Sequence, residues 1–350
     1  MTRRVTMQQI GDHLGISKNS VSQALSGKDG VSEETRSLVI KTAKEMGYKY
    51  TNNRSSAQNQ THTGNLGLIA SDFAFSMKGF FGEIYLRIQQ EANLMGKNLL
   101  IYSVSPTDEN ALTLPHFIQN KEVDGILILS HTCIEYTNKV IDTGIPTVLV
   151  DHHHPFIQAD AVLTNNRFGA FNAIQHLIDL GHRDIAFIGN TSFSPSYQER
   201  LDGYLLALKE NNIPSNLDFI HENASEDERL IEDFIVSRKT KPTAWFCVND
   251  ALGFIVCSTL LKLGYRIPKD MSVCNFDNGQ LSQIAVPKIT TMDIDLKIFA
   301  KRAVEKLMWR IDNLGKPFEE ILLPTQLIKR ESTGIATSTE SMTIGKISRA

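Results

Sequence analysis

The sequence predicts an α/β protein with two parts, a three-helix unit at the N-terminus and a two-lobed core built on parallel sheets. Two observations carry this prediction. Within the first 48 residues, apolar side chains recur at helical spacing in three short segments, each preceded by a capping residue. From Asn65 onward, short β-branched apolar runs alternate with amphipathic segments of helical length, a pattern typical of strands that helices cover on both faces of a sheet.

Composition and charge limit the possible classes of protein. The chain has 350 residues, 41% of them hydrophobic and 21% charged, as in ordinary globular proteins. No apolar run reaches the roughly 20 residues that span a bilayer. No apolar signal region follows Met1 either, so we expect a cytoplasmic protein with no membrane partner. Residues 1–60 carry nine Lys or Arg against five Asp or Glu, whereas the remainder carries 27 against 34. A basic head on an acidic body is expected where only the head meets a polyanion.

Three short helices are predicted in the basic head. Thr6–Gln9 has the sequence of a capping box, in which the threonine hydroxyl and the glutamine side chain each satisfy a backbone amide. That first helix ends at Gly15, and Ser17 is expected to cap a second helix. Ser32 caps a third helix, which ends at Gly47.

This spacing is typical of a helix-turn-helix module, whose second helix enters the major groove of DNA. The start of that helix presents Lys18 and Asn19, and Gln23 follows one turn later. Asparagine and glutamine pair bidentately with adenine, and lysine favours the acceptors of guanine. The alternative is a three-helix cap that only mediates protein contacts. The candidate DNA-binding residues are Thr6, Ser17, Lys18, Asn19, Ser22 and Gln23.

The core is predicted to contain two Rossmann-like lobes, around residues 65–163 and 164–289, because strand-like and helix-like segments alternate in each. The expected strands are Leu66–Ala70, Asn98–Tyr102, Gly125–Leu129, Thr147–Val150, Ile185–Ile188, Ala244–Val248 and Ser272–Phe276. The expected helices include Glu83–Leu94, Phe168–Leu180 and Ala251–Leu263. Before the core, residues 49–64 are rich in Asn, Ser, Thr and Gln and predict a flexible linker.

Polar residues follow several predicted strands at their carboxyl ends, where open α/β sheets bind ligands. Carboxylates, an amide and a guanidinium together can hold vicinal hydroxyls, because each forms paired hydrogen bonds. The candidate effector-binding residues are Asp72, Phe81, Asp151, Arg200, Asn249 and Asp277. Structural alternatives remain for neighbouring residues and for the aromatic one. Asp250 is expected to cap a helix rather than touch a ligand, and Phe81 and Trp245 could equally belong to the core.

Catalytic, cofactor and metal sites are not expected. No Gly-rich phosphate loop follows the first predicted strand, and no G-x-S-x-G turn occurs, so we predict a protein that is not an enzyme and binds no cofactor. The four cysteines are scattered and form no C-x-x-C pair. In His152–His154, adjacent side chains point to opposite sides of an extended chain, so at most two could share an ion. We interpret this run as a solvated loop.

Several of these segments resemble a known family. Val5–Gly27, Gly30–Arg36 and Glu45–Tyr48 are similar to the headpiece of the LacI/GalR family of bacterial transcription regulators, and the resemblance continues to Arg330–Gly334. It implies a periplasmic-binding-protein-like core and a homodimer on a near-palindromic operator, with one recognition helix in each half-site. By the same resemblance, Lys18, Asn19 and Gln23 occupy specificity positions, and Arg200, Asn249 and Asp277 occupy effector-binding positions.

The linker departs from the family pattern. The resemblance implies a hinge helix that carries a proline near its start and a leucine wedged into the minor groove. Here Tyr50 stands where the proline is expected, and Ala57 is the nearest candidate for the leucine. An alanine side chain is too short to unstack a base step, so we predict little hinge-driven bending of the operator.

The resemblance also supplies the expected domain limits. These are a headpiece over residues 1–48, a linker over 49–64, a core over 65–334 and a frayed tail over 335–350. The first lobe is expected to span 65–163 and 290–322, and the second lobe 164–289 and 323–334.

The expected function is transcriptional repression controlled by a small molecule between the lobes, with a sugar as the first choice of effector. A nucleobase, a sugar phosphate or a phosphoprotein co-regulator is the alternative. A sugar-binding protein with no DNA-binding role would share the core, but the basic head and the missing signal region oppose it.

Overall fold

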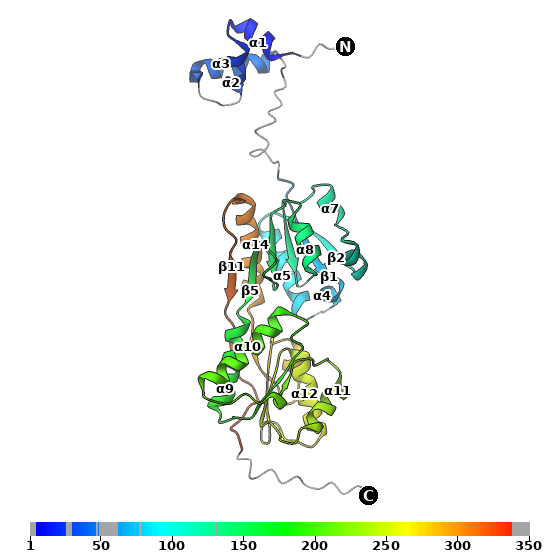
Figure 1. Ribbon diagram of the computed structural model, residues 1–350. Coiled ribbons are helices and arrows are strands. Elements are labelled where there is room, and N and C mark those ends of the chain that lie inside the picture. Colours follow the sequence, from blue (N-terminus) through cyan, green and yellow to red (C-terminus); the bar gives the residue numbers. More distant parts are fainter. Residues whose placement is uncertain are drawn as a thin grey trace. The chain divides into compact units, whose positions relative to one another are not determined.

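A computed structural model describes residues 5–25, 30–46, 48, 62–76, 79–130 and 132–337 of the chain. The chain divides into two compact units, Met1–His62 and Thr63–Ala350 (Figure 1). The predicted linker residues Tyr50 and Ala57 lie outside the described residues, as do residues 338–350 of the predicted tail. The frayed tail was predicted to begin at residue 335, and this is wrong for Ala336. Its backbone N–H donates to the carbonyl of Leu180 at 2.8 Å.

The N-terminal unit contains the three predicted helices, α1 (Met7–Leu14), α2 (Lys18–Leu25) and α3 (Glu33–Glu45). The capping box is present: the Thr6 hydroxyl accepts the Gln9 amide, and the Gln9 side chain accepts the Thr6 amide at 2.9 Å. One buried apolar cluster joins the three helices, formed by Ile10, Val21, Ala24, Val39 and Ala43. The helix-turn-helix arrangement predicted from the sequence is therefore confirmed.

The core unit contains two six-stranded sheets within the described residues. In the first sheet the order is β11 (Glu320–Leu323), β5 (Asp160–Thr164), β4 (Thr147–Val150), β3 (Gly125–Leu129), β1 (Asn65–Ser71) and β2 (Asn98–Val104). In the second it is β12 (Gln326–Ile328), β10 (Thr290–Asp293), β9 (Ser272–Phe276), β8 (Ala244–Cys247), β6 (Ile185–Ile188) and β7 (Ile220–His221). The neighbouring strands are parallel except for β10 and β12, which confirms the predicted α/β class.

Helices pack against both sheets, and the pair α5 (Phe80–Leu94) and α14 (Leu296–Asp312) shows how segments that are distant in the sequence are held together. The core helices are α4 (Asp72–Ser76), α5 (Phe80–Leu94), α6 (Pro106–Ala111), α7 (His116–Gln119), α8 (Ile134–Ile141), α9 (Asn166–Asp179), α10 (Pro195–Glu210), α11 (Glu228–Ser237), α12 (Asp250–Lys262), α13 (Gln280–Ile284) and α14 (Leu296–Asp312). The late helix α14, orange in Figure 1, lies beside α5 and the first sheet. Arg310 and Lys306 on α14 fix this position by pairing with Asp160 of β5, which is fully buried.

The chain crosses between the lobes at three places: after β5, after β10 and between β11 and β12. The second of these differs from the expectation that the first lobe resumes at residue 290. Thr290 pairs in register with Cys274 of β9, so β10 belongs to the second sheet and the crossing follows Asp293. The reason is that β10 satisfies its backbone groups on both sides, with β9 and with β12.

Apolar residues of the strands fill the interior. Each of the five residues of β3 is buried, and Trp245 on β8 is fully buried with its indole N–H donating to the Met271 sulfur. Trp245 is therefore part of the core and not of a ligand site. Across the part of the chain that the structure describes, no helix combines the length and the apolar character needed to cross a bilayer.

Candidate functional site

A cavity of about 290 Å³ lies between the two lobes of the core unit. Its walls come from segments that follow the carboxyl ends of strands in both sheets, where the sequence places ligand-binding residues. The lining residues are Phe73, Phe80, Phe81, Ser130, Asp151, Asn190, Phe193, Ser194, Ser196, Tyr197, Arg200, Ala224, Ser225, Glu226, Asn249, Leu252 and Asp277. Concave sites of this size, with an apolar wall and a few convergent polar groups, are typical of small-molecule sites.

Arg200 is the central cation of this cavity. It lies on α10, is only 2% exposed, and donates through Nη1 to Asp277 Oδ1 at 3.1 Å and through Nε to Asn166 Oδ1 at 2.9 Å. Nη1 also donates to the backbone carbonyl of Val248. The guanidinium carbon lies 3.8 Å from the centre of the Phe276 ring, a cation–π contact. These contacts hold the guanidinium in one orientation before any ligand arrives.

Two carboxylates of the cavity carry backbone strain and shifted pKa values. Asp151 has a φ of 59° and Asp277 a φ of 93°, in the left-handed region that non-glycine residues rarely adopt. Burial raises the pKa of Asp151 to about 7, although the charge of Arg200 opposes the shift. Burial likewise raises the pKa of Asp277. Among the described side chains, Asp151 Oδ1 is buried without a hydrogen-bond partner, so a ligand donor would satisfy it.

Asn249 connects the cavity to the helix that follows it. Its Oδ1 accepts the backbone N–H of Leu252 at 2.9 Å, so Asn249 is the N-cap of α12. Its Nδ2 donates to the Tyr197 hydroxyl and to Glu226 Oε1, both at 2.8 Å. The expectation that Asp250 caps this helix is therefore wrong, because Asn249 has the extended backbone that a cap requires.

Asp250 is instead the first residue of α12, and its carboxylate accepts Asn275 Nδ2 at 3.2 Å. It does not line the cavity. Burial, followed by the charge of Asp277, raises the pKa of Asp250 to about 6.

The aromatic wall comes from both lobes. Phe73 and Phe81 of the first lobe face the cavity, as does Phe193 of the second. The rings of Phe73 and Phe193 meet edge to face at 5.2 Å between centroids. Of the two positions left open for Phe81, the structure therefore shows both: its side chain lines the cavity and also packs against the core. Asp72 does not line the cavity as predicted, because it is exposed and accepts the hydroxyl of Ser103 on β2.

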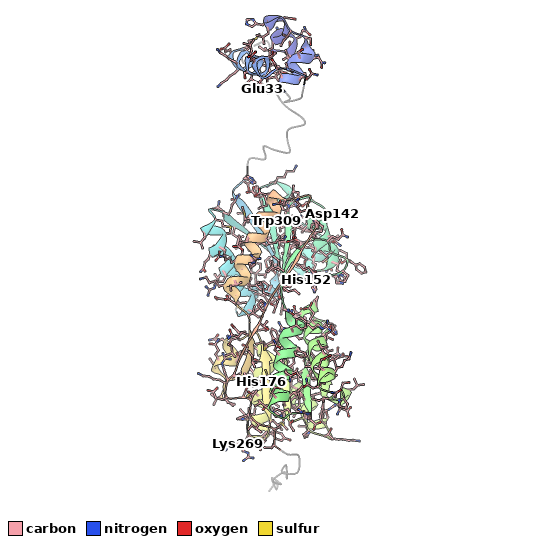
Figure 2. All side chains as sticks on the ribbon, turned by 90° about the vertical axis from the view of Figure 1, so that its left-hand side faces the viewer. Glu33, Asp142, His152, His176, Lys269 and Trp309 are labelled. Carbon is pink, nitrogen blue, oxygen red and sulfur yellow. The ribbon has the colours of Figure 1, made fainter. Side chains whose placement is uncertain are left out.

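The histidine run is not a solvated loop, and that interpretation is wrong. His152 is 5% exposed and lies where the first lobe faces the second (Figure 2). His153 Nε2 lies 2.8 Å from Glu199 Oε1, and Nδ1 lies 3.0 Å from Glu320 Oε1. The hydrogen bond to Glu199 is the largest cause that raises the pKa of His153 to about 9. Within the described ranges no group of three metal-ligating side chains is found.

Several cavity residues were not predicted from the sequence. Tyr197, Ser196 and Glu226 line the cavity, and Glu199 pairs with His153 just outside it. The first two belong to the same helix as Arg200, so helical spacing from that arginine could have suggested them. No local signal identifies Glu226 or the His153 pairing, since the partners are far apart in the sequence.

The candidate DNA-binding residues lie at the N-terminus of α1, for Thr6, and at the start of α2 or along it, for the others. Ser17 accepts the Ser20 amide at 3.0 Å and so caps α2, while Lys18 and Asn19 are exposed on its first turn. Ser22 and Gln23 are half-buried, as expected for residues beside the buried Val21 and Ala24. The arrangement exposes donors and acceptors at the N-terminal end of the second helix, where helix-turn-helix modules read base edges.

Comparisons with known proteins agree with this geometry. Residues 6–50 match the family model described as bacterial regulatory proteins, lacI family, and residues 174–333 match the periplasmic binding protein-like domain. The repressor PurR of Vibrio vulnificus (strain CMCP6) is 30% identical over 332 residues, covering 93% of this chain and 98% of that protein.

Two solved structures share the fold over almost the whole chain. A complex of the transcriptional regulator CelR with cellobiose has a TM-score of 0.70 at 24% identity, covering 94% of this chain and 100% of that one. The lac repressor dimer bound to operator and the anti-inducer ONPF has a TM-score of 0.68 at 22% identity, covering 95% and 100%.

Proposed function

The chain belongs to the lacI family of bacterial regulatory proteins and is a DNA-binding transcriptional regulator, and from this premise we propose that it represses transcription under the control of a hydroxyl-rich small molecule bound between its lobes. We assign residues 1–48 to operator binding and residues 65–334 to effector binding. A regulator of this kind acts where its operator is, in the cytoplasm, and the proposal gives the chain no catalytic step and no cofactor.

The set of polar groups around Arg200 is the observation that carries the effector class. Asp151, Asn249 and Asp277 converge on the cavity, and Asp151 Oδ1 is buried without a hydrogen-bond partner among the described side chains. Such a set suits neighbouring hydroxyls, each of which can donate and accept. The cellobiose bound to CelR is one carbohydrate ligand of this fold.

Other effector classes fit less well. A sugar phosphate would meet the carboxylates of Asp151, Glu226 and Asp277, while Arg200 is already paired with Asp277. A nucleobase is the second candidate, because the rings of Phe73, Phe81 and Phe193 could stack on its face. A phosphoprotein co-regulator would bind outside the cavity and leave its ligand groups unused.

Control of DNA binding requires that the ligand bind one arrangement of the lobes more tightly than the other. We propose a homodimer whose two headpieces occupy half-sites of a near-palindromic operator. The similar lac repressor structure is a dimer bound to operator. Leu86 and Leu94 on α5 are 49% and 80% exposed, and Ile101 on the edge strand β2 is 42% exposed. These apolar side chains support a dimer contact through the first lobe, including the α5 segment.

The effector class is tested by thermal unfolding of the full chain in the presence of sugars, sugar phosphates and nucleobases. A ligand at a hundred times its Kd adds about 2.7 kcal/mol, which raises the melting temperature visibly. A sugar should shift the wild type but not Arg200→Ala or Asp277→Ala, and it should still shift Asp72→Ala, because Asp72 lies outside the cavity lining. A response to nucleobases alone would replace the proposed effector class.

Operator recognition is tested separately, by selecting binding sites from random duplexes. Asn19→Ala and Gln23→Ala should each lose discrimination at one position of the selected site, at a cost of about 1–3 kcal/mol per bidentate contact. Gln8→Ala on α1 is the matched control, since its side chain pairs with Asp12 on the same helix. Unchanged preferences in both variants would contradict the assignment of α2 as the recognition helix.

A further inference from the structure

We propose that His153 is a positioning residue that clamps the two lobes together and, through Glu199 and Asn166, holds Arg200 in its ligand-binding orientation. The inference rests on the proposed function only for the role of Arg200. The clamp itself is a property of the core unit and needs neither DNA nor effector.

The clamp joins side chains from three segments. His153 follows β4 and Glu320 is on β11, so both belong to the first lobe, whereas Glu199 is on α10 of the second lobe. The two ring nitrogens of His153 lie 2.8 Å from Glu199 Oε1 and 3.0 Å from Glu320 Oε1. A change in the arrangement of the lobes would alter the first distance while leaving the second one intact.

A continuous set of hydrogen bonds leads from this clamp to the cavity. Glu199 accepts Asn166 Nδ2 at 3.0 Å through its other oxygen, Oε2. Asn166 Oδ1 in turn accepts Arg200 Nε at 2.9 Å, and Arg200 Nη1 donates to Asp277. Asn166 also stands directly after the β5 crossing, where its Nδ2 donates to the Thr164 carbonyl at 3.2 Å. The orientation of Arg200 is therefore connected to the contact between the lobes by three successive side chains, Asn166, Glu199 and His153.

Charge makes the clamp depend on the protonation of His153. Only an imidazolium donates from both ring nitrogens, and two carboxylates face it here. These two carboxylates raise its pKa to about 9, so the ring is charged at neutral pH. Asp151 also interacts with the charge of His153, and Asp151 in turn interacts with Arg200, Asp277 and Glu199. The clamp should hold at pH 7 and loosen as the pH rises through 9.

The distance between the lobes is the direct test. Spin labels at Asp142→Cys, on the first lobe (Figure 2), and at Lys209→Cys, on α10 of the second, report this distance in a Cys133→Ser background. Labelled protein is diluted with unlabelled protein so that only distances within one chain are measured. We expect a narrow distribution for the clamped wild type at pH 7 that broadens above pH 9, and a broad distribution for His153→Gln at both pH values.

Matched variants separate the clamp from a general loss of structure. His154→Gln changes the neighbouring histidine, whose ring lies 5.3 Å from that of Phe156 in a tilted arrangement, and should behave as the wild type. Glu320→Gln removes a carboxylate that is 55% exposed and should move the pH of broadening downward without unfolding the chain. His153→Arg keeps a charge at pH 10 and should restore the narrow distribution there.

The link to Arg200 is read from its own Nε–H signal in a nitrogen–proton spectrum, assigned with Arg200→Lys. In the wild type this proton is held by Asn166, and we expect the signal to be lost to solvent exchange in His153→Gln but retained in His154→Gln. A narrow distance distribution in His153→Gln that does not respond to pH would overturn the clamp. A retained Nε–H signal alongside a broadened distribution would overturn the positioning of Arg200.

Discussion

Removal of Arg200 should destabilise the core, because this arginine is buried together with its counterion Asp277. Replacing the arginine with methionine keeps most of the side-chain volume but leaves Asp277 without its cation. Loss of one partner of a buried pair costs about 3–5 kcal/mol, and protonation of Asp277, whose pKa is already raised, limits the cost to the lower end. Urea denaturation of Arg200→Met against wild type measures the loss.

Arg266→Met is the control for this prediction. Arg266 pairs with Asp270 on the surface, where its side chain is 70% exposed. Exposed ion pairs contribute little to stability because solvent screens them, so this variant should unfold near the wild-type urea concentration. Equal losses in the two variants would mean that the Arg200 pairing contributes no more than a surface pair.

Asp151 should make the stability of the core depend on pH. Its pKa in the folded chain is about 7, above its ordinary value of 3.8, so folding favours the protonated form. The contribution of protonated Asp151 to the free energy of unfolding is therefore fully present below about pH 4 and is lost as the pH rises through 7. Asparagine cannot ionise and tolerates the positive φ. Asp151→Asn should therefore match the wild type at pH 4 and be more stable above pH 7, by about 4 kcal/mol, because a pKa difference of one corresponds to about 1.4 kcal/mol.

Thermal unfolding between pH 4 and pH 9 measures this difference, with Asp72→Asn as the control. Asp72 is exposed and lies outside the cavity lining, so Asp72→Asn shows the effect of the same replacement away from the site. A wild type and an Asp151→Asn variant with parallel profiles would show that Asp151 is already ionised, and therefore solvated, in the folded chain.

At the scale of elements, the contact between α9 and α10 depends on a glycine. A Cβ at Gly203 would lie 2.1 Å from the Arg167 carbonyl oxygen and 2.9 Å from Ala170 Cβ, both on α9. Alanine favours a helix over glycine by about 1 kcal/mol, but a backbone oxygen cannot move aside as a side chain can. Overpacking a well-packed interior usually lowers stability by about 1–3 kcal/mol. We expect Gly203→Ala to lie near the upper end of this range. Gly203→Ala should therefore be less stable, and the melting temperature measures it.

Gly315→Ala provides the comparison, because a Cβ there meets nothing within 4 Å. Its stability should stay within about 0.5 kcal/mol of the wild type. If Gly203→Ala were as stable as Gly315→Ala, the two helices would not approach as closely as the structure places them.

Several of the strands that were predicted from the sequence have uninterrupted apolar runs, such as Gly125–Leu129 and Ala244–Cys247. β5 was missed as a strand because it begins with Asp160, and a charged residue argues locally against a buried strand. The partner that makes this burial possible, Arg310, lies 150 residues further along the chain. Burying the Asp160 carboxylate costs free energy, and Arg310 offsets that cost. Because Arg310 is distant in the sequence, the residues around Asp160 do not indicate that it can be buried.

In the candidate site too, some residues could be predicted from the local sequence, whereas others depend on partners that are distant in the sequence. Asp151, Asn249 and Asp277 could be placed because the ends of parallel strands meet at one edge of a sheet, whereas Arg200, on α10, was placed through the family resemblance. Asp72 follows a strand in the same way, yet its side chain points to Ser103, since position after a strand does not decide side-chain direction. His153 could not be interpreted from its neighbours, because its two partners lie 46 and 167 residues away.

At the scale of the whole molecule, the periodicity of the sequence predicts two lobes but not how the chain is shared between them. Strand order depends on pairings such as that of β11 with β5, which join segments more than a hundred residues apart. The family resemblance supplied the crossover pattern. One crossing, predicted at residue 290, follows Asp293 in the structure. Pairing of backbone groups, which no local pattern records, decides such limits.

The two compact units have separate apolar cores, and this separation leads to the last prediction. Ile10 is fully buried in the N-terminal cluster, which contains no residue of the core unit. Ile10→Ala should cost about 2–5 kcal/mol, comparable with the whole stability of so small a unit at roughly 0.05–0.15 kcal/mol per residue. We expect a headpiece that is largely unfolded and does not bind DNA, beside a core that melts as in the wild type. Circular dichroism melting followed by a duplex-binding assay measures both effects.

Ile88→Ala, in the core unit, is the control and should have the opposite effect. It should lower the melting temperature of the core, while DNA binding persists below that temperature. A core transition lowered equally by Ile10→Ala would mean that the two units unfold as one.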